Sequence, residues 1–154
     1  MTAWVVLHEL RLNRIVRAAP YHASYGESLL GLAPGQRISV RDLLYGMVLV
    51  SGNDAAYALA LAAGGSERHF VRQMNRQAVA LGLTDTHYAN PIGLDQPGNY
   101  SSARDLTTLA RRLLRLPAFA RIADSRSATL RSLRPPRRIV RSTGCCGWRP
   151  GRTA

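Results

Sequence analysis

The sequence predicts a mainly α-helical domain, and two observations lead to this fold class. Apolar residues recur at helical spacing, three and four residues apart, in several separate segments of the 154-residue chain. Three of these segments begin at a serine, a residue that commonly caps the first turn of a helix. The length is that of one domain that can bury a core.

The first predicted helix carries apolar residues at Trp4, Leu7, Leu10 and Leu12. No capping residue precedes it, so we expect the chain to begin inside a helix. Residues 20–35 are rich in turn-forming residues and are predicted to be irregular or partly extended.

Two helices are predicted to meet near residue 51. Ser39 and Asp42 form the start of the first, with the serine as cap and the acid near the positive end of the helix dipole. This helix is apolar over most of its surface up to residue 50, which predicts that it is buried. The second covers residues 54–63, is rich in alanine and ends at Gly64 and Gly65.

Two longer helices and one long connection follow. Ser66 is predicted to cap a helix that ends near Gly82, with Arg68, Arg72 and Arg76 as a solvated stripe on one face. Residues 83–100 are a connection of a length that is more often functional than idle. Ser102 then starts a helix that is stopped before residue 117, and a short helical turn is expected over residues 119–122.

The composition changes beyond Asp124, where Arg, Ser, Pro and Gly dominate. The net charge of +12 is concentrated here, because residues 121–154 hold nine arginines and one acid. Pro135 and Pro136 disfavour regular structure, and apolar periodicity is lost after Leu133. We therefore expect a domain over residues 1–124 and an Arg/Pro-rich tail over residues 125–154 that is disordered or translated out of frame.

The stretch Ser51-Gly52-Asn53 is the main candidate for chemistry because it lies at the junction of two predicted helices. A serine hydroxyl can relay a proton, and an asparagine amide can both donate to and accept from a substrate amide. The alternative is purely structural, since Ser51 or Asn53 could cap the helix that follows.

Other site classes have little support in the sequence. The four histidines are scattered, and Cys145 and Cys146 are adjacent, which suits neither a zinc site nor a structural disulfide, so we expect no metal and no cofactor. No apolar stretch is long enough to cross a bilayer, and residues 1–20 do not read as an export signal. All 21 basic residues are arginine, so the chain supplies no lysine to any mechanism.

Several spaced motifs in the same order resemble the D-alanyl-D-alanine carboxypeptidases, the low-molecular-mass penicillin-binding proteins. These motifs are Met1-Thr2-Ala3, Asp42-Leu43-Leu44-Tyr45-Gly46, Ser51 to Ala56, Phe70 with Met74-Asn75, Leu81-Gly82-Leu83, Asn90-Pro91 with Gly93-Leu94-Asp95, and Ser101 to Leu106. The resemblance extends from Met1 to about Asp124. It implies part of the β-lactamase/transpeptidase-like α/β fold: a helical subdomain with a partial sheet of one or two short strands, and exposed apolar helix faces where the rest of the sheet would pack.

The resemblance assigns catalytic roles to Ser51 and Asn53 and a substrate-binding role to Asn90 and Gly93. In the family, Ser-x-Asn acts with Ser-x-x-Lys, which supplies the acylated serine, and with Lys-Thr-Gly, which binds the substrate carboxylate. Neither lysine motif occurs in this chain. The nearest string to the third motif, Ser142-Thr143-Gly144, has serine in place of lysine and is read as coincidence.

The implied function is serine-type carboxypeptidase activity on the peptidoglycan stem peptide, through an acyl-enzyme and without a metal or cofactor. Intact relatives would also bind β-lactams and act outside the cytoplasmic membrane. This chain is expected to be inactive, truncated at both ends relative to the family, and cytoplasmic when expressed alone. Reading out of frame is expected to begin between about Arg126 and Arg141, because GC-rich codons read in a shifted frame produce Arg, Pro, Gly and Cys.

Two other functions stay open on the sequence. The first is a non-catalytic module that binds peptidoglycan near Ser51 and residues 90–95. The second is nucleic-acid binding by the arginine-rich tail, which we rank lower because the sequence has no recognition motif and no interleaved aromatic residues.

Overall fold

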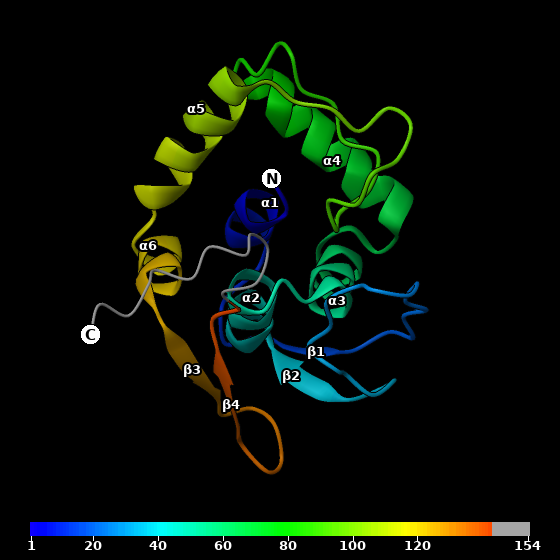
Figure 1. The fold of residues 1–154 in the computed structure, drawn as a ribbon, viewed down its shortest axis with the longest axis vertical. Coiled ribbons are helices and arrows are strands. Elements are labelled where there is room, and N and C mark those ends of the chain that lie inside the picture. Colours follow the sequence, from blue (N-terminus) through cyan, green and yellow to red (C-terminus); the bar gives the residue numbers. More distant parts are fainter. Residues whose placement is uncertain (143–154) are drawn as a thin grey trace, which may run out of the picture.

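The computed structural model describes residues 1–142, which form six α-helices and two small antiparallel hairpins (Figure 1). The helices are α1 Thr2–Glu9, α2 Val40–Leu49, α3 Asn53–Gly64, α4 Glu67–Ala80, α5 Ala103–Leu114 and α6 Pro117–Asp124. The strands are β1 Ile15–Arg17, β2 Arg37–Ser39, β3 Ser127–Leu130 and β4 Arg137–Val140. The mainly α-helical fold class with a partial sheet is confirmed.

Helix α1 occupies the centre of the molecule, where Figure 1 shows it end-on with the other helices around it. Its side chains Val5 and Val6 are almost completely buried. The helix ends at Glu9, three residues earlier than the apolar spacing to Leu12 suggests. The reason is tertiary, because the backbone of residues 12–18 pairs instead with β2, the start of α2 and the loop before β2.

The serine caps predicted from the sequence are confirmed for three helices. The Ser39 hydroxyl accepts from the Asp42 N–H at 3.1 Å, the Ser66 hydroxyl from His69 N–H at 3.3 Å, and the Ser102 hydroxyl from Asp105 N–H at 3.2 Å. Each cap satisfies a backbone donor that the first helical turn leaves without a partner. The starts of α2, α4 and α5 are therefore fixed by local sequence.

Helices α2 and α3 form the core of the subdomain together with α1. The α2 side chains Leu43 and Leu44 have no exposed surface, and Leu49 has 1%. The small alanines of α3 allow close packing against α1 and α2, and Leu59 is fully buried among them. Both ends of the α2–α3 junction are thus held by packed helices.

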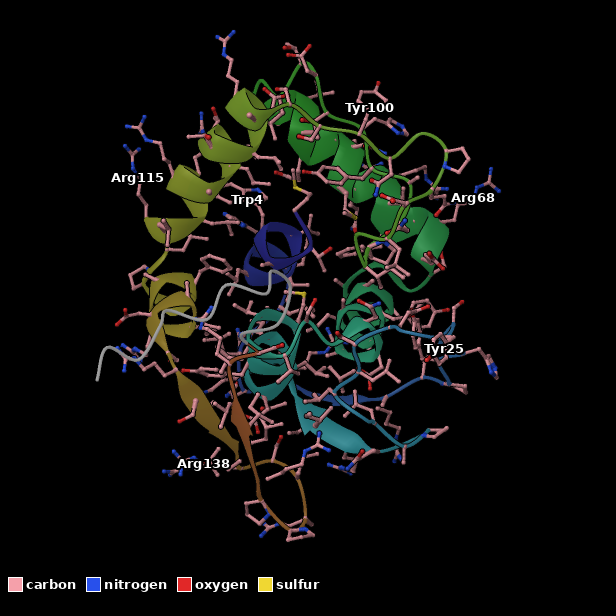
Figure 2. The ribbon with its side chains drawn as sticks, in the orientation of Figure 1. Trp4, Tyr25, Arg68, Tyr100, Arg115 and Arg138 are labelled. Carbon is pink, nitrogen blue, oxygen red and sulfur yellow. The ribbon has the colours of Figure 1, made fainter. Side chains whose placement is uncertain are left out.

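The outer helices α4, α5 and α6 bury one face each. On α4, Phe70, Met74 and Ala78 point inward, while Arg68, at the surface in Figure 2, lies in the predicted exposed stripe with Arg72 and Arg76. No helix within residues 1–142 is long and apolar enough to cross a membrane.

Helix α5 exposes part of its apolar face. Leu109 and Leu113 are buried, but Leu106 and Leu114 are 52% and 54% exposed. Val79 on α4 is 81% exposed. Whether these side chains lie where the rest of the sheet would pack, and whether they form one patch of several hundred Å², stays a prediction.

Two hairpins lie near α2, and both lie on the same side of the helices in Figure 1. In the first, Ile15 pairs with Ser39 and Arg17 with Arg37. In the second, Ser127 pairs with Val140 and Leu130 with Arg137. Residues 1–142 therefore contain four short strands, where the sequence led us to expect one or two.

The second hairpin corrects one part of the tail prediction, because residues 127–140 are folded and not disordered, whereas a change of reading frame stays a prediction. Leu130, Leu133 and Ile139 are buried, so the segment contributes to the core. The Pro135-Pro136 pair lies in the connection between β3 and β4, where it interrupts regular structure without preventing the strands on either side. Sequence reasoning missed the hairpin because its strands are only four residues long and the segment that contains them is rich in arginine.

Polar contacts also join this hairpin to the helical body. The buried Asp42 carboxylate accepts from the backbone N–H of Ser132 at 2.8 Å and from its hydroxyl at 2.7 Å. The Ser142 N–H donates to the Leu49 carbonyl at 2.7 Å. The folded unit thus extends to residue 142. Residues 143–154, with Cys145, Cys146 and most of the Ser142-Thr143-Gly144 string, lie outside the described residues, and predictions about them stay predictions.

Candidate active site

The predicted site lies at the junction between α2 and α3, where the backbone takes an unusual conformation. Ser51 has φ 54°, the one positive φ at a non-glycine residue within residues 1–142. The next residue, Gly52, is buried, and a Cβ there would lie 3.0 Å from the Leu30 nitrogen. A side chain at residue 52 would therefore crowd the loop that covers the junction.

Ser51 combines backbone strain with exposure. The left-handed region costs a serine about 1–2 kcal/mol, because its Cβ approaches the following carbonyl. Ser51 is exposed, and its hydroxyl makes no hydrogen bond to any other described residue. A strained, exposed polar residue held between two buried helices is typical of a functional site.

Replacing Ser51 with glycine is expected to raise the free energy of unfolding by about 0.5 kcal/mol, because glycine adopts positive φ without a steric cost and loses only part of that gain to chain entropy. The control, Ser28→Gly, changes an exposed serine without positive φ and should lower stability by about 0.5 kcal/mol. Urea unfolding of both variants measures the difference. Equal destabilisation by the two glycines would show that Ser51 is not strained.

Asn53 does not cap α3, so the capping alternative is wrong for this residue and for Ser51. The cap position is Gly52, which makes no side-chain bond, and Asn53 is the first residue of the helix. Its side chain is buried and donates from Nδ2 to Glu27 Oε2 at 3.0 Å. Its backbone N–H donates to the Ser28 carbonyl at 2.9 Å. Asn53 is thus held by the loop between β1 and β2.

Asp54 holds the same loop a few residues further on. Its carboxylate accepts from the backbone N–H groups of Leu30 at 2.7 Å, Gly31 at 2.8 Å and Leu32 at 2.9 Å. It also accepts from the Ala55 N–H at 2.9 Å. The three bonds to Leu30, Gly31 and Leu32 fix the loop over the start of α3 and so define one wall of the site.

Glu27 links the loop to Asn53 through a small polar network. Its carboxylate accepts from the Tyr21 hydroxyl, from Asn53 Nδ2, and from the Ser24 N–H at 2.9 Å. The hydrogen bond from Tyr21, with those from Asn53 and Ser24, lowers the pKa of Glu27 below its usual value. Burial and the neighbouring Glu27 carboxylate raise the pKa of Tyr21. The glutamate is therefore ionised and the tyrosine neutral near pH 7.

The predicted substrate-binding residues Asn90 and Gly93 lie in the 83–100 connection. The Asn90 Oδ1 accepts from the N–H groups of Ile92 at 3.2 Å and Gly93 at 2.7 Å, and its Nδ2 donates to the Leu94 carbonyl and to Gln96. Asn90 is buried and organises this turn with its own side chain. Direct contact of Asn90 or Gly93 with a substrate stays a prediction.

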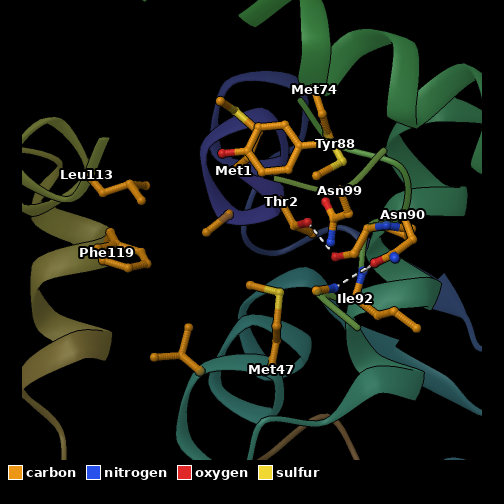
Figure 3. A pocket seen from close by; sticks show the side chains of 14 residues that line it. Met1, Thr2, Met47, Met74, Tyr88, Asn90, Ile92, Asn99, Leu113 and Phe119 are labelled. Carbon is orange, nitrogen blue, oxygen red and sulfur yellow. Dashed lines mark hydrogen bonds between the residues drawn. The ribbon is translucent and has the colours of Figure 1, made fainter. Parts of the chain in front are cut away.

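A cavity of about 340 Å³ lies beside this turn (Figure 3). It is bordered by the start of α1, the last turn of α2, Met74 of α4, the 88–93 segment, the end of α5 and the start of α6. The Thr2 hydroxyl donates to the Pro91 carbonyl at 2.6 Å and ties the turn to α1, as Figure 3 shows. The lining includes Met1, Met47 and Phe119, so this space is mainly apolar.

The structure places Ser51 and Asn53 together at the helix junction, and it places Asn90 and Gly93 together beside the cavity. Sequence reasoning missed Glu27, Tyr21 and the clamp formed by Asp54. Asp54 adjoins Ser-x-Asn and could have been suspected, but nothing in the sequence links Glu27 to a residue 26 positions away. Within residues 1–142 no group of three His, Cys, Asp or Glu side chains is arranged to hold a metal ion.

The fold, a helical subdomain with short hairpins and an exposed Ser51 between two buried helices, is shared with solved D-alanyl-D-alanine carboxypeptidase and DD-transpeptidase structures, of which this chain covers a part. Residues 1–136 match the family described as D-alanyl-D-alanine carboxypeptidase, and the chain belongs to that family. The match extends past Asp124, where the resemblance in the sequence ended.

Individual relatives agree with this assignment. The chain is 37% identical over 123 residues to the D-alanyl-D-alanine carboxypeptidase DacF of Bacillus subtilis, which covers 80% of this chain and 32% of DacF. The crystal structure of a D-alanyl-D-alanine carboxypeptidase from Mycobacterium tuberculosis superposes with TM-score 0.82 at 39% identity, covering 91% of this chain and 53% of that one. The crystal structure of the Streptomyces K15 DD-transpeptidase superposes with TM-score 0.76 at 35% identity, covering 83% of this chain and 53% of the transpeptidase chain. The chain thus spans about a third of DacF and about half of each crystallised chain.

Proposed function

We propose that this chain forms the Ser-x-Asn side of a D-Ala-D-Ala carboxypeptidase site and recognises the D-alanyl-D-alanine end of a peptidoglycan stem peptide. The observation that carries the proposal is the α2–α3 junction, where Ser51 is strained and exposed and Asn53 is fixed by Glu27. In this role Ser51 relays protons around the reacting groups, and Asn53 hydrogen-bonds the substrate amide. Membership of the family supports both roles.

We also propose that the chain alone forms no acyl-enzyme. The acylated serine of Ser-x-x-Lys requires a lysine that can become neutral and accept a proton, and all 21 basic residues here are arginine. Incubating the purified protein with a fluorescent penicillin should therefore give no covalent label. A band that survives denaturation and disappears after competition with unlabelled penicillin would contradict this.

Peptide recognition without acylation can be measured directly. An acylated peptide ending in D-Ala-D-Ala, titrated into ¹⁵N-labelled protein, should give saturable shifts around Ser51 and Asn53, and Asn53→Ala should weaken binding about tenfold through loss of one hydrogen-bonding group. The matched control, Asn13→Ala, removes an asparagine from the turn before β1 and should leave the affinity unchanged. The L-Ala-L-Ala peptide is the ligand control. Equal shifts with both peptides, or none, would overturn the proposal.

For the isolated chain, the proposal and the binding-module alternative predict the same result in these two experiments. Saturable binding together with absent penicillin labelling describes a chain that acts as a non-catalytic peptidoglycan-binding module. Peptidoglycan lies outside the cytoplasmic membrane, so the family is proposed to act there, whereas this chain expressed alone is proposed to stay in the cytoplasm. Fractionation of cells that express a tagged version of the chain tests its location, and recovery of the tag from outside the cytoplasmic membrane would contradict the second statement.

Nucleic-acid binding by the arginine-rich segment has less support once the contacts of its arginines in the fold are known. Arg137 donates to the Leu30 carbonyl at 2.6 Å, and Arg141 donates to the carbonyls of Ala123 and Ser125. These two arginines of the basic segment are therefore engaged in internal structure. Removing residues after Asp124 would also remove buried Leu130 and Ile139 and would test stability as much as nucleic-acid affinity.

A further inference from the structure

The loop between β1 and β2 places the Glu27 carboxylate directly against the side chain of Asn53, which is proposed to hydrogen-bond the substrate amide. Glu27 Oε2 accepts from Asn53 Nδ2 at 3.0 Å and also accepts from the Tyr21 hydroxyl. Glu27 Oε1 accepts from the Ser24 N–H at 2.9 Å. The carboxylate is therefore held by three donors and does not rotate freely.

A carboxylate can only accept hydrogen bonds, so the atom of Asn53 that faces Glu27 must be the amide nitrogen. This settles which way the Asn53 amide is turned. One of its two N–H groups is used by Glu27, which leaves the second N–H and the carbonyl Oδ1 for a ligand. Without an acceptor at this place, the two ends of the amide could exchange positions by a rotation of the side chain.

The network continues from the loop to the helix that carries Asn53. The Tyr21 ring lies against the Tyr57 ring of α3, with centroids 5.4 Å apart and planes tilted by 51°. The Asn53 N–H donates to the Ser28 carbonyl at 2.9 Å, on the same loop. Glu27 is thus anchored on both sides of its contact with Asn53.

We propose that Glu27 is a positioning residue that fixes the orientation of the Asn53 side-chain amide and thereby sets which hydrogen-bonding groups Asn53 presents to a peptide ligand. The orientation itself follows from the contacts. The consequence for a ligand rests on the proposed function, so the two are tested by separate measurements.

The orientation is tested without a ligand, by following the Asn53 side-chain NH₂ signals of ¹⁵N-labelled protein as the pH changes. These signals are assigned by their loss in Asn53→Asp. Their chemical shifts should change as Glu27 titrates, below the usual pKa of a glutamate, because protonation weakens the Glu27 carboxylate as a hydrogen-bond acceptor. The charged neighbours of this network are Asp54 and Glu67, which both act on Tyr21. Glu27→Gln should abolish the shift. Glu9→Gln, a matched change at an exposed residue of α1, should retain it.

Two outcomes overturn the orientation: Asn53 signals that do not follow the titration in the wild-type protein, or signals that still follow it in Glu27→Gln. Dispersed backbone spectra of the variant exclude unfolding as the cause. If Glu27→Gln does not fold, Glu27→Asp provides the same test. Aspartate keeps the charge but shortens the side chain by one methylene, so its carboxylate should no longer reach Asn53. The pH-dependent change in the Asn53 NH₂ chemical shifts should then be lost, and its retention would overturn the orientation.

The consequence for a ligand is tested by titrating the peptide ending in D-Ala-D-Ala. Glu27→Gln should weaken binding about twofold, because a glutamine amide can face Asn53 with either end, which leaves about half of the molecules in the binding orientation. Tight binding by the wild-type protein and by Glu27→Gln alike would overturn the positioning role. Absence of binding by the wild-type protein would instead count against the proposed function, while the pH response of the Asn53 signals would still decide the orientation.

Discussion

Asp54→Asn is expected to lower the free energy of unfolding by about 3 kcal/mol, one of the two largest effects we predict. The carboxylate of this buried residue accepts from the N–H groups of Leu30, Gly31 and Leu32 at 2.7–2.9 Å. An asparagine has only one accepting oxygen, and its NH₂ group would take the place of the second carboxylate oxygen. That NH₂ group would then face backbone N–H donors of the loop and could not accept from them. A buried donor left unpaired costs about 1–3 kcal/mol, and hydrogen bonds to a charged group are worth more than neutral ones.

Chemical denaturation of the wild-type protein, Asp54→Asn and the control Asp95→Asn measures this effect. Asp95 is an exposed residue of the 83–100 connection, so its substitution should change stability by less than about 0.5 kcal/mol. Because the loop held by Asp54 also carries Glu27, the asparagine variant should weaken peptide binding as well. An Asp54→Asn protein as stable as the control would mean that the loop is held by its other contacts.

Leu130→Ala is expected to destabilise the protein by about 3 kcal/mol, within the range for a leucine that leaves a cavity in a packed core. Leu130 is in β3 and has no exposed surface. This prediction tests whether the segment after Asp124 is part of the folded unit. A disordered tail would tolerate the substitution without any change in stability.

The opposing strand supplies a matched control for this prediction. Val140 in β4 is 62% exposed, so Val140→Ala should cost less than about 0.5 kcal/mol. Both substitutions shorten an aliphatic side chain in the same hairpin, and burial is the main difference between them. Thermal unfolding and denaturant unfolding should rank the variants in the same order. Equal stability of the two variants would show that the hairpin does not pack as the structure places it.

Local sequence determined the helices because their signals are contained within a few residues. Ser39, Ser66 and Ser102 each accept from a backbone N–H three residues later, so the start of each helix is encoded next to the helix itself. Apolar spacing likewise predicted the buried face of α4 at Phe70 and Met74. The position of Ser-x-Asn between two helices followed from the same signals.

Tertiary structure decided the elements whose partners lie far away in the sequence. The β3–β4 hairpin is stabilised by Asp42, which accepts from Ser132, 90 residues away in the sequence. Buried apolar side chains also stabilise it, and they are hard to recognise in a segment rich in arginine. The end of α1 at Glu9 depends on backbone pairing with residues near Arg37. No window of the sequence contains these interactions, since each forms only when distant backbone groups meet.

The same division applies to the site. The sequence by itself determined that Ser51 and Asn53 stand at a break between buried helices, and it supplied the residues that identify the family. Only the tertiary structure decided that Ser51 takes a left-handed backbone and that Asn53 bonds to Glu27 rather than capping α3. The physical reason is that backbone strain and the choice of a hydrogen-bonding partner depend on the loop between β1 and β2 closing over the start of α3.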